Sequence, residues 1–245
     1  MITRRGFAGV AALALAGTLG ACSEGSSQLS VELVGEAPAS TVLPGQDLAQ
    51  TALALSSALF AAADAAVIAS PDTVAVLAPV SARTGLPLLV GTDQMVADEI
   101  SRLGARTVVT ATGTDLSALG DGAEIIEIDP ADPEAEAELP EAATGEQAVL
   151  VTLLVDPELE LPAQALAAAV VEAAGGSVAE IPGGALGRSS ESVAAVTEAA
   201  GDDAAVGVLA LGESFGAADD FADALARTAG TPELPGGGVT ALPGR

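Results

Sequence analysis

The stretch Ala63-Asp64-Ala65-Ala66-Val67-Ile68-Ala69-Ser70-Pro71-Asp72 decides the fold class of this chain. Residues 65–69 form a short apolar run that ends at a Pro71-Asp72 turn, so we expect a buried strand there. A helix is expected directly after it, over Val74 to Arg83, with Pro79 kinking or delimiting that helix. A buried strand followed at once by a helix predicts a unit of a parallel sheet.

The same alternation continues on both sides of this stretch. Upstream, Asp47 is the expected N-cap of a helix over Leu48 to Ala63, because apolar residues recur there at helical spacing. Downstream, the expected elements are a strand over Leu86–Val90, a helix over Gln94–Leu103 capped by Thr92 or Asp93, and strands over Arg106–Ala111 and Glu124–Ile128. Alternating strands and helices predict right-handed crossovers between parallel strands.

A second segment repeats this outline. Its expected strands are Ala148–Val155, Ser177–Ile181 and Val206–Leu211, and its expected helices are Pro162–Ala174, Ser189–Ala200 and Ala217–Ala229. Asp156-Pro157 supplies the turn after the first of these strands, much as Pro71-Asp72 does in the first segment. The prediction is therefore an α/β protein made of two related, Rossmann-like parallel-sheet units that follow a signal peptide, with a duplication as their origin.

Composition places the boundaries of these units. The expected order is a signal peptide (1–21), a lipid anchor and flexible tether (22–40), a first α/β unit (41–129), an acidic Pro/Ala linker (130–146), a second α/β unit (147–230) and a Pro/Gly tail (231–245). Within the tether, Leu29 to Val34 alternates weakly and is compatible with a short edge strand.

The first residues, Met1 to Cys22, indicate where the protein is located. Arg4 and Arg5 precede an apolar run of about 11 residues, well below the roughly 20 that span a bilayer, which indicates a signal peptide. The sequence Thr3-Arg4-Arg5-Gly6-Phe7 resembles the twin-arginine export signal, in which Arg4, Arg5 and Phe7 would be read by the export machinery. An ordinary secretory signal is the alternative.

Leu19-Gly20-Ala21-Cys22 resembles the lipobox of bacterial lipoproteins. Small residues before the cysteine let the signal peptidase close on the backbone, and the thiol receives a diacylglyceryl group. Cys22 is the only cysteine of the chain and stands where the apolar run ends. The resemblance implies a lipidated Cys22, carrying palmitate-type chains, that anchors the protein to the outer face of the cell membrane. A buried or free thiol is the alternative.

Charge and residue types exclude several functions. The chain has 34 Asp and Glu against 8 Arg and no Lys, a net charge of −26 that repels nucleic acid and anionic head groups. It has no His and a single Cys, so the usual zinc sites and His-dependent triads are excluded. Four Phe, with no Trp or Tyr, argue against stacking on sugars. We expect no metal, no cofactor and no catalysis, although an all-carboxylate glycosidase site remains open.

Motifs between residues 43 and 113 occur in the order of a known family. They are Gly45-Gln46-Asp47-Leu48-Ala49-Gln50-Thr51-Ala52, Ala63-Asp64-Ala65-Ala66-Val67, Gly85-Leu86-Pro87-Leu88-Leu89 and Leu103-Gly104-Ala105-Arg106-Thr107-Val108. This order resembles the type 2 cell-wall-binding repeat of Gram-positive surface proteins, which implies a Rossmann-like fold. Family members usually carry three repeats and hold anionic wall polymer. Here Leu48-Ala49 replaces the family's Arg-Tyr pair, at most two units are present and the net charge is negative.

Candidate ligand-binding residues lie in the loops that follow the predicted strands, where parallel α/β units bind their ligands. They are Asp72, Thr92, Asp93, Thr114 and Asp115. The loops Asp156-Pro157 and Gly212-Glu213-Ser214 are candidates for the same reason, and Arg188 closes a Gly-rich loop that could hold a phosphate. Turns and helix caps use the same residue types, which is the alternative interpretation.

Together these features predict an extracytoplasmic lipoprotein that binds or scaffolds at the cell envelope without catalysis. Its expected partners are the membrane, through Cys22, and a cell-wall polymer or another envelope protein, but no nucleic acid. The alternative is a solute-binding lipoprotein of an uptake system, because two α/β units on a lipid anchor also fit that class.

Overall fold

The computed structural model describes residues 29–36, 38, 40–43, 45, 47–119, 122–129, 132, 139, 142–144, 151–181 and 207–229. The signal peptide (1–21), the helix expected over 189–200 and the tail (231–245) lie outside these residues. Within them the predicted α/β class is confirmed, with two four-stranded sheets in which every pairing is parallel and a smaller three-stranded sheet.

The first large sheet is built from the stretch around residues 65–69. Its strand order is β5 (Leu88–Val90), β4 (Ala65–Ala69), β6 (Thr107–Ala111) and β7 (Glu124–Ile128). Helix α2 (Val74–Thr84) connects β4 to β5 and contains Pro79, as expected, and α3 (Gln94–Leu103) connects β5 to β6. The three buried strands are short and rich in Val, Leu and Ala, the pattern of strands covered on both faces.

The second large sheet has an equivalent order, β10 (Ser177–Glu180), β9 (Val151–Val155), β11 (Gly207–Leu211) and β2 (Thr41–Leu43). Helix α5 (Leu161–Ala173) connects β9 to β10, as α2 connects β4 to β5. The fourth strand differs between the sheets, because β2 comes from the beginning of the described chain and pairs with β11, 168 residues later in sequence. The expected first unit therefore gives its opening strand to the second sheet.

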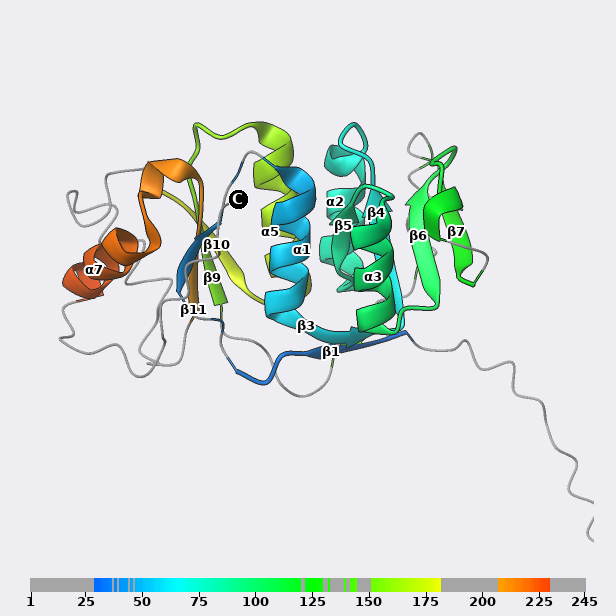
Figure 1. Ribbon diagram of the computed structural model, residues 1–245, viewed down its shortest axis with the longest axis horizontal. Coiled ribbons are helices and arrows are strands. Elements are labelled where there is room, and N and C mark those ends of the chain that lie inside the picture. Colours follow the sequence, from blue (N-terminus) through cyan, green and yellow to red (C-terminus); the bar gives the residue numbers. More distant parts are fainter. Residues whose placement is uncertain are drawn as a thin grey trace, which may run out of the picture.

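The helices lie in three layers, one between the two sheets, at the centre of Figure 1, and one on the outer face of each sheet. Side chains alternate along each strand, so Val67 and Val109 face a central layer of α1 (Leu48–Leu59), α2 and α5, together with Leu153 and Leu209 of the second sheet. On the opposite faces, Ile68 and Val108 pack under α3. Leu154 and Ala210 pack under α7 (Ala218–Ala229). The two sheets consequently share one hydrophobic core, which is the central helical layer.

The helix expected over Leu48 to Ala63 is shorter than predicted. Asp47 caps it as expected, accepting a hydrogen bond from the Gln50 backbone N–H at 3.0 Å. The helix ends at Leu59, and Phe60–Ala63 is instead strand β3, antiparallel to β1 (Ser30–Leu33). Alanine has the highest intrinsic helix propensity, but such preferences are small, and here strand pairing and the burial of Phe60 override them.

The third sheet, in the order β3-β1-β8 (Ala143–Thr144), brings both expected connecting segments into the folded body. The strand expected near 29–34 is confirmed, but it is central in its sheet rather than at an edge. Asp64 accepts hydrogen bonds from the Ser30 backbone N–H at 2.9 Å and from its hydroxyl at 2.5 Å, which lowers the pKa of that carboxyl. Two residues of the expected linker, Leu139 and Ala142, are buried in the shared core.

Candidate functional site

The carboxyl ends of the strands in the first sheet carry five of the predicted site residues. Because these strands are parallel, Asp72, Thr92, Asp93, Thr114 and Asp115 all lie at one edge of the sheet. In Figure 1 this edge is at the top, where the turn into α2 is drawn, and the turn between β9 and α5 lies at the same side. The expected grouping of the loops at one edge is therefore present.

Most of these residues are engaged in their own turns. Asp93 caps α3, accepting hydrogen bonds from the backbone N–H groups of Met95 and Val96 at 3.0 and 3.1 Å. Asp115 accepts from the Ser117 backbone N–H at 3.0 Å, and hydrogen bonds from Ser117 hold the pKa of Asp115 below its usual value. The Thr114 hydroxyl donates to the Ala111 carbonyl at 2.7 Å. These contacts match turn and cap chemistry.

Asp72 and Thr92 complete the edge of the first sheet. Asp72 is exposed in the turn that leads into α2, and the hydroxyl of Thr73 in that turn accepts a hydrogen bond from the Ser70 backbone N–H at 2.9 Å. Thr92 is half-buried directly before the Asp93 cap. Arg188, Arg4, Arg5, Phe7 and Cys22 lie outside the residues that the structure describes.

The second sheet joins two candidate loops across neighbouring strands. Asp156 follows β9 directly and is only 4% exposed. One of its carboxylate oxygens accepts a hydrogen bond from the Glu158 backbone N–H at 2.9 Å, and the other accepts from the hydroxyl of Ser214, in the loop that follows β11. Gly212, in the same loop as Ser214, has a φ of +123°. A Cβ there would lie 3.2 Å from a methyl carbon of Leu159.

This contact lies where the chain leaves adjacent strands toward opposite faces of the sheet. After β9 the chain enters α5 in the central layer, whereas after β11 it enters the short helix Glu213–Phe215, which packs on the outer face with α7. Such a switch point is where open α/β sheets usually bind ligands. In the first sheet Ser70 and Thr114 hold the equivalent positions, and each bonds within its own turn. The structure therefore adds to the predicted loops a direct contact between Asp156 and Ser214.

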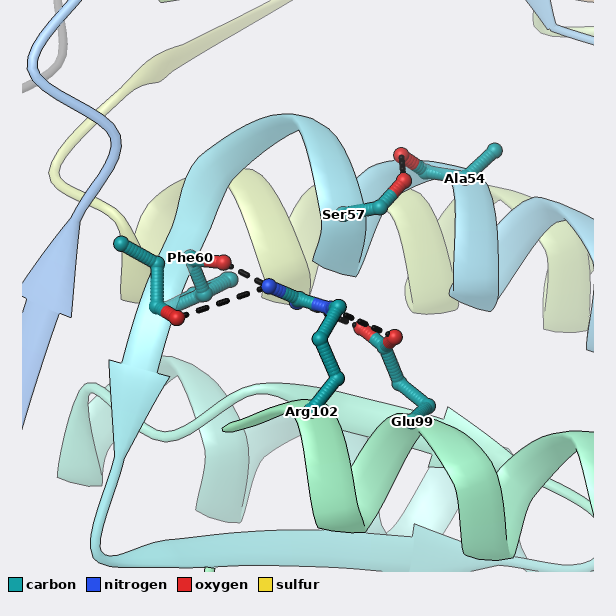
Figure 2. A network of polar contacts seen from close by, with 6 residues as sticks. Ala54, Ser57, Phe60, Glu99 and Arg102 are labelled. Carbon is teal, nitrogen blue, oxygen red and sulfur yellow. Dashed lines mark hydrogen bonds and ion pairs between the residues drawn. The ribbon is translucent and has the colours of Figure 1, made fainter. Parts of the chain in front are cut away.

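A charged network lies at the end of α1 (Figure 2). The Arg102 guanidinium donates hydrogen bonds from Nε and Nη2 to the two carboxylate oxygens of Glu99, both at 2.7 Å. Nη2 also donates to the Phe60 carbonyl at 3.0 Å, close to the C-terminus of α1. Burial alone would raise the pKa of Glu99, but the hydrogen bonds and the charge of Arg102 outweigh it and hold that pKa below its usual value.

A cavity of about 610 Å³ lies beside this network, between α1, α3 and the face of the second sheet at β2. Apolar side chains form most of its wall: Pro38, Leu43, Leu53, Ala54, Leu55, Ala58, Met95 and Leu209. Its polar lining residues are Thr41, Ser57, Asp98, Glu99 and Arg102. Small-molecule sites in proteins have this size and this mainly apolar character.

Sequence reasoning missed both the network and the cavity. A signal for the network was available, because Glu99 stands next to Ile100 and within the apolar stripe of α3, where an acid needs a partner one turn away. The cavity gave no local signal, since its walls come from segments far apart in sequence. In the described part of the chain, no group of three or more His, Cys, Asp or Glu could hold a metal ion. No described helix is long and apolar enough to cross a membrane.

Comparisons with known proteins give one weak likeness. No protein-family model matches the chain, and no curated protein matches it. A solved structure, Cwp6 from Clostridium difficile, superposes with a TM-score of 0.48 at 8% sequence identity, covering 73% of this chain. The match covers 48% of that protein, so the chain spans about half its length.

Proposed function

We propose that this protein is an extracytoplasmic lipoprotein that is anchored to the cell membrane through Cys22 and binds or scaffolds at the cell envelope. The single observation that carries the proposal is the order of features in residues 1–22: two arginines, an apolar run too short to span a bilayer, and the only cysteine of the chain directly after it. Several acyl chains on one cysteine hold firmly, because each buried CH₂ contributes about 0.8 kcal/mol.

Binding is proposed in place of catalysis because of residue composition. The whole chain lacks His, and its one Cys stands at the lipidation position, so the common Ser-His and Cys-His pairs of nucleophile and base cannot form. The motif order between residues 43 and 113 supports a role at the envelope, since it resembles repeats that bind cell-wall polymer. The net charge of −26 opposes direct contact with an anionic polymer, which makes bridging by divalent cations the physical requirement for such binding.

Labelling with a radioactive or clickable palmitate tests the anchor. We expect the wild-type protein to carry the label and to sediment with membranes, and Cys22→Ser to be unlabelled and released from them. Replacing Arg4 and Arg5 by Lys tests the export route, and we expect it to leave the protein inside the cell. Unlabelled wild-type protein would contradict the anchor, whereas unchanged export of the double variant would contradict only the twin-arginine route.

Sedimentation with isolated cell walls tests envelope binding. The protein is mixed with walls before and after removal of their anionic polymers, with calcium or with a chelator. We expect sedimentation that needs both the polymer and calcium, because carboxylates and polymer would share the cation. Absence of sedimentation in every condition would contradict the proposal of wall binding, whereas the proposal of a lipid anchor would still stand.

One structural observation favours the alternative, a solute-binding lipoprotein. The cavity beside α1 is also lined by β2 and β11 of the second sheet and by α3, which packs on the first sheet, and small-molecule sites occur preferentially where two such units meet. A thermal-shift screen of small solutes separates the two functions, because a ligand that binds only the native state raises the melting temperature. A solute that does so at micromolar concentration would favour uptake over scaffolding.

A further inference from the structure

We propose that the cavity between α1, α3 and β2 binds the single aliphatic chain of an amphiphile whose head group is not anionic. The inference develops the alternative function above, by naming a ligand class for this cavity. It does not depend on lipidation of Cys22. Its basis is the chemistry of the cavity wall and the charge at its mouth.

The wall fits a flexible chain better than a ring or a sugar. Leucine, alanine, proline and methionine side chains make up its apolar part, and none of the lining residues that the structure describes is aromatic. A sugar would need ring stacking or several convergent hydrogen-bond partners. An aliphatic chain needs only apolar contact, and the volume of about 610 Å³ lies well inside the range of small-ligand sites.

Small residues line the α1 side of the cavity. Ala54, Ser57 and Ala58 stand on one side of the helix, at the spacing that places residues on a common face. The Ser57 hydroxyl donates to the Ala54 carbonyl at 3.0 Å, so its proton is already bonded within the helix. A chain lying along this side of the cavity would therefore meet the Cβ atoms of these three residues and a hydroxyl whose proton is already bonded.

The charge at the mouth selects the head group. Glu99 and Arg102 neutralise each other through their paired hydrogen bonds. Asp98 is an exposed carboxylate of the cavity wall, and it accepts a hydrogen bond from the neutral amide of Gln94 at 2.8 Å. Its negative charge therefore remains, and the net charge of −26 adds to it. A fatty-acid carboxylate or a phosphate is repelled there, whereas a neutral or cationic head group is accepted.

Three amphiphiles with the same tail test this inference. The full chain carrying Cys22→Ser is titrated by calorimetry with monolaurin, dodecyltrimethylammonium and laurate, each below its micelle-forming concentration. We expect one-to-one binding of the neutral and cationic compounds and at least tenfold weaker binding of laurate. At a concentration about 100 times the dissociation constant, the melting temperature is expected to rise by about 5–10 °C.

A matched pair of variants locates the site. Ala58→Phe fills the cavity and is expected to abolish binding, whereas Ala168→Phe, at a half-buried alanine in the separate groove between α2 and α5, leaves it unchanged. Asp98→Asn is expected to weaken binding of dodecyltrimethylammonium about two- to fivefold and to leave monolaurin unaffected.

Binding of all three amphiphiles that Ala58→Phe does not reduce would overturn the inference, as would the absence of binding by monolaurin and dodecyltrimethylammonium. Tightest binding by laurate would overturn the head-group argument. Stabilisation by a hydrophilic solute without amphiphile binding would overturn this ligand class and still support a solute-binding protein, so the two failures are distinguishable.

Discussion

Arg102 and Glu99, three residues apart on α3, form a two-point ion pair in which each carboxylate oxygen of Glu99 accepts one hydrogen bond at 2.7 Å. The Glu99 side chain is 9% exposed and that of Arg102 is 38% exposed. The same guanidinium donates to the carbonyl of Phe60, where α1 ends and β3 begins. The pair therefore connects α3 to the point at which the chain changes from helix to strand.

Removing Arg102 is expected to cost more than neutralising Glu99. Arg102→Met leaves a mostly buried carboxylate without its partner, and we expect the free energy of unfolding to fall by about 1–2 kcal/mol. Glu99→Gln keeps one acceptor for Arg102, so its expected cost is about 0.5–1 kcal/mol. Urea denaturation of both variants measures this difference. A greater loss for Glu99→Gln would contradict the conclusion that the carboxylate of Glu99 is the buried charge that needs its partner.

The ion pair also predicts a pH dependence. The pKa of Glu99 in the folded protein lies below its ordinary value of 4.5, so the ionised form is favoured by folding. Its contribution to stability is complete above pH 4.5 and is lost as the pH falls through the lowered pKa. The stability difference between wild type and Glu99→Gln should therefore shrink on acidification below pH 4.5, as urea midpoints at several pH values will show. A difference that grows there would contradict a lowered pKa.

Much of the fold could be predicted because the buried strands are short apolar runs separated by turns. The stretch around residues 65–69 predicted a strand and helix that both exist, and the expected cap at Thr92 or Asp93 predicted the start of α3, where Asp93 is the cap. The end of α1 could not be predicted, since Phe60–Ala63 continues the helical pattern and becomes a strand only by pairing with β1. The placement of β2 beside β11 likewise depends on a pairing between distant segments.

The sequence predicts which loops form the candidate site, but not the contacts that their side chains make. Parallel strands placed Asp72, Asp93 and Asp115 at one edge, as expected, but the local hydrogen bonds of Asp93 and Asp115 depend on turn geometry that their sequence leaves open. The contact of Asp156 with Ser214 depends on the register of β9 with β11, in which Val155 lies opposite Leu211. A one-residue change of register would separate the two side chains.

Ser214→Ala tests whether Asp156 needs its cross-strand partner. Because Asp156 is 4% exposed, loss of the hydroxyl leaves one carboxylate oxygen with poor access to water, and we expect a loss of about 1–2 kcal/mol in the free energy of unfolding. Thr114→Ala, at the equivalent position of the first sheet, removes only a bond to the Ala111 carbonyl and is the matched control. Denaturation with urea compares them, and equal costs would show that the cross-strand contact adds nothing.

Gly176 is a position where a single added methyl group is expected to destabilise the shared core. A Cβ there would lie 2.5 Å from Val151 Cγ1, 2.6 Å from Val171 Cγ1 and 2.8 Å from the Val151 carbonyl oxygen. The space is closed because Gly176 passes between the end of α5 and strand β9, with its backbone N–H bonded to the Val171 carbonyl at 2.9 Å. Gly176→Ala should therefore force apart a helix and a strand of the shared core.

We expect Gly176→Ala to lower the free energy of unfolding by about 2–3 kcal/mol, the upper part of the range for overpacked cores. Gly122→Ala is the matched control, because a Cβ at Gly122 would meet no atom within 4 Å, and its cost should be near zero. Combining Gly176→Ala with Val151→Ala removes one clashing methyl group but leaves the carbonyl oxygen in place, so the double variant should recover only part of the loss beyond the cost of Val151→Ala alone. Thermal and urea unfolding of the four proteins would measure this coupling. Full recovery would mean that the backbone of β9 moves freely away from α5, contrary to the close contact that Gly176 permits.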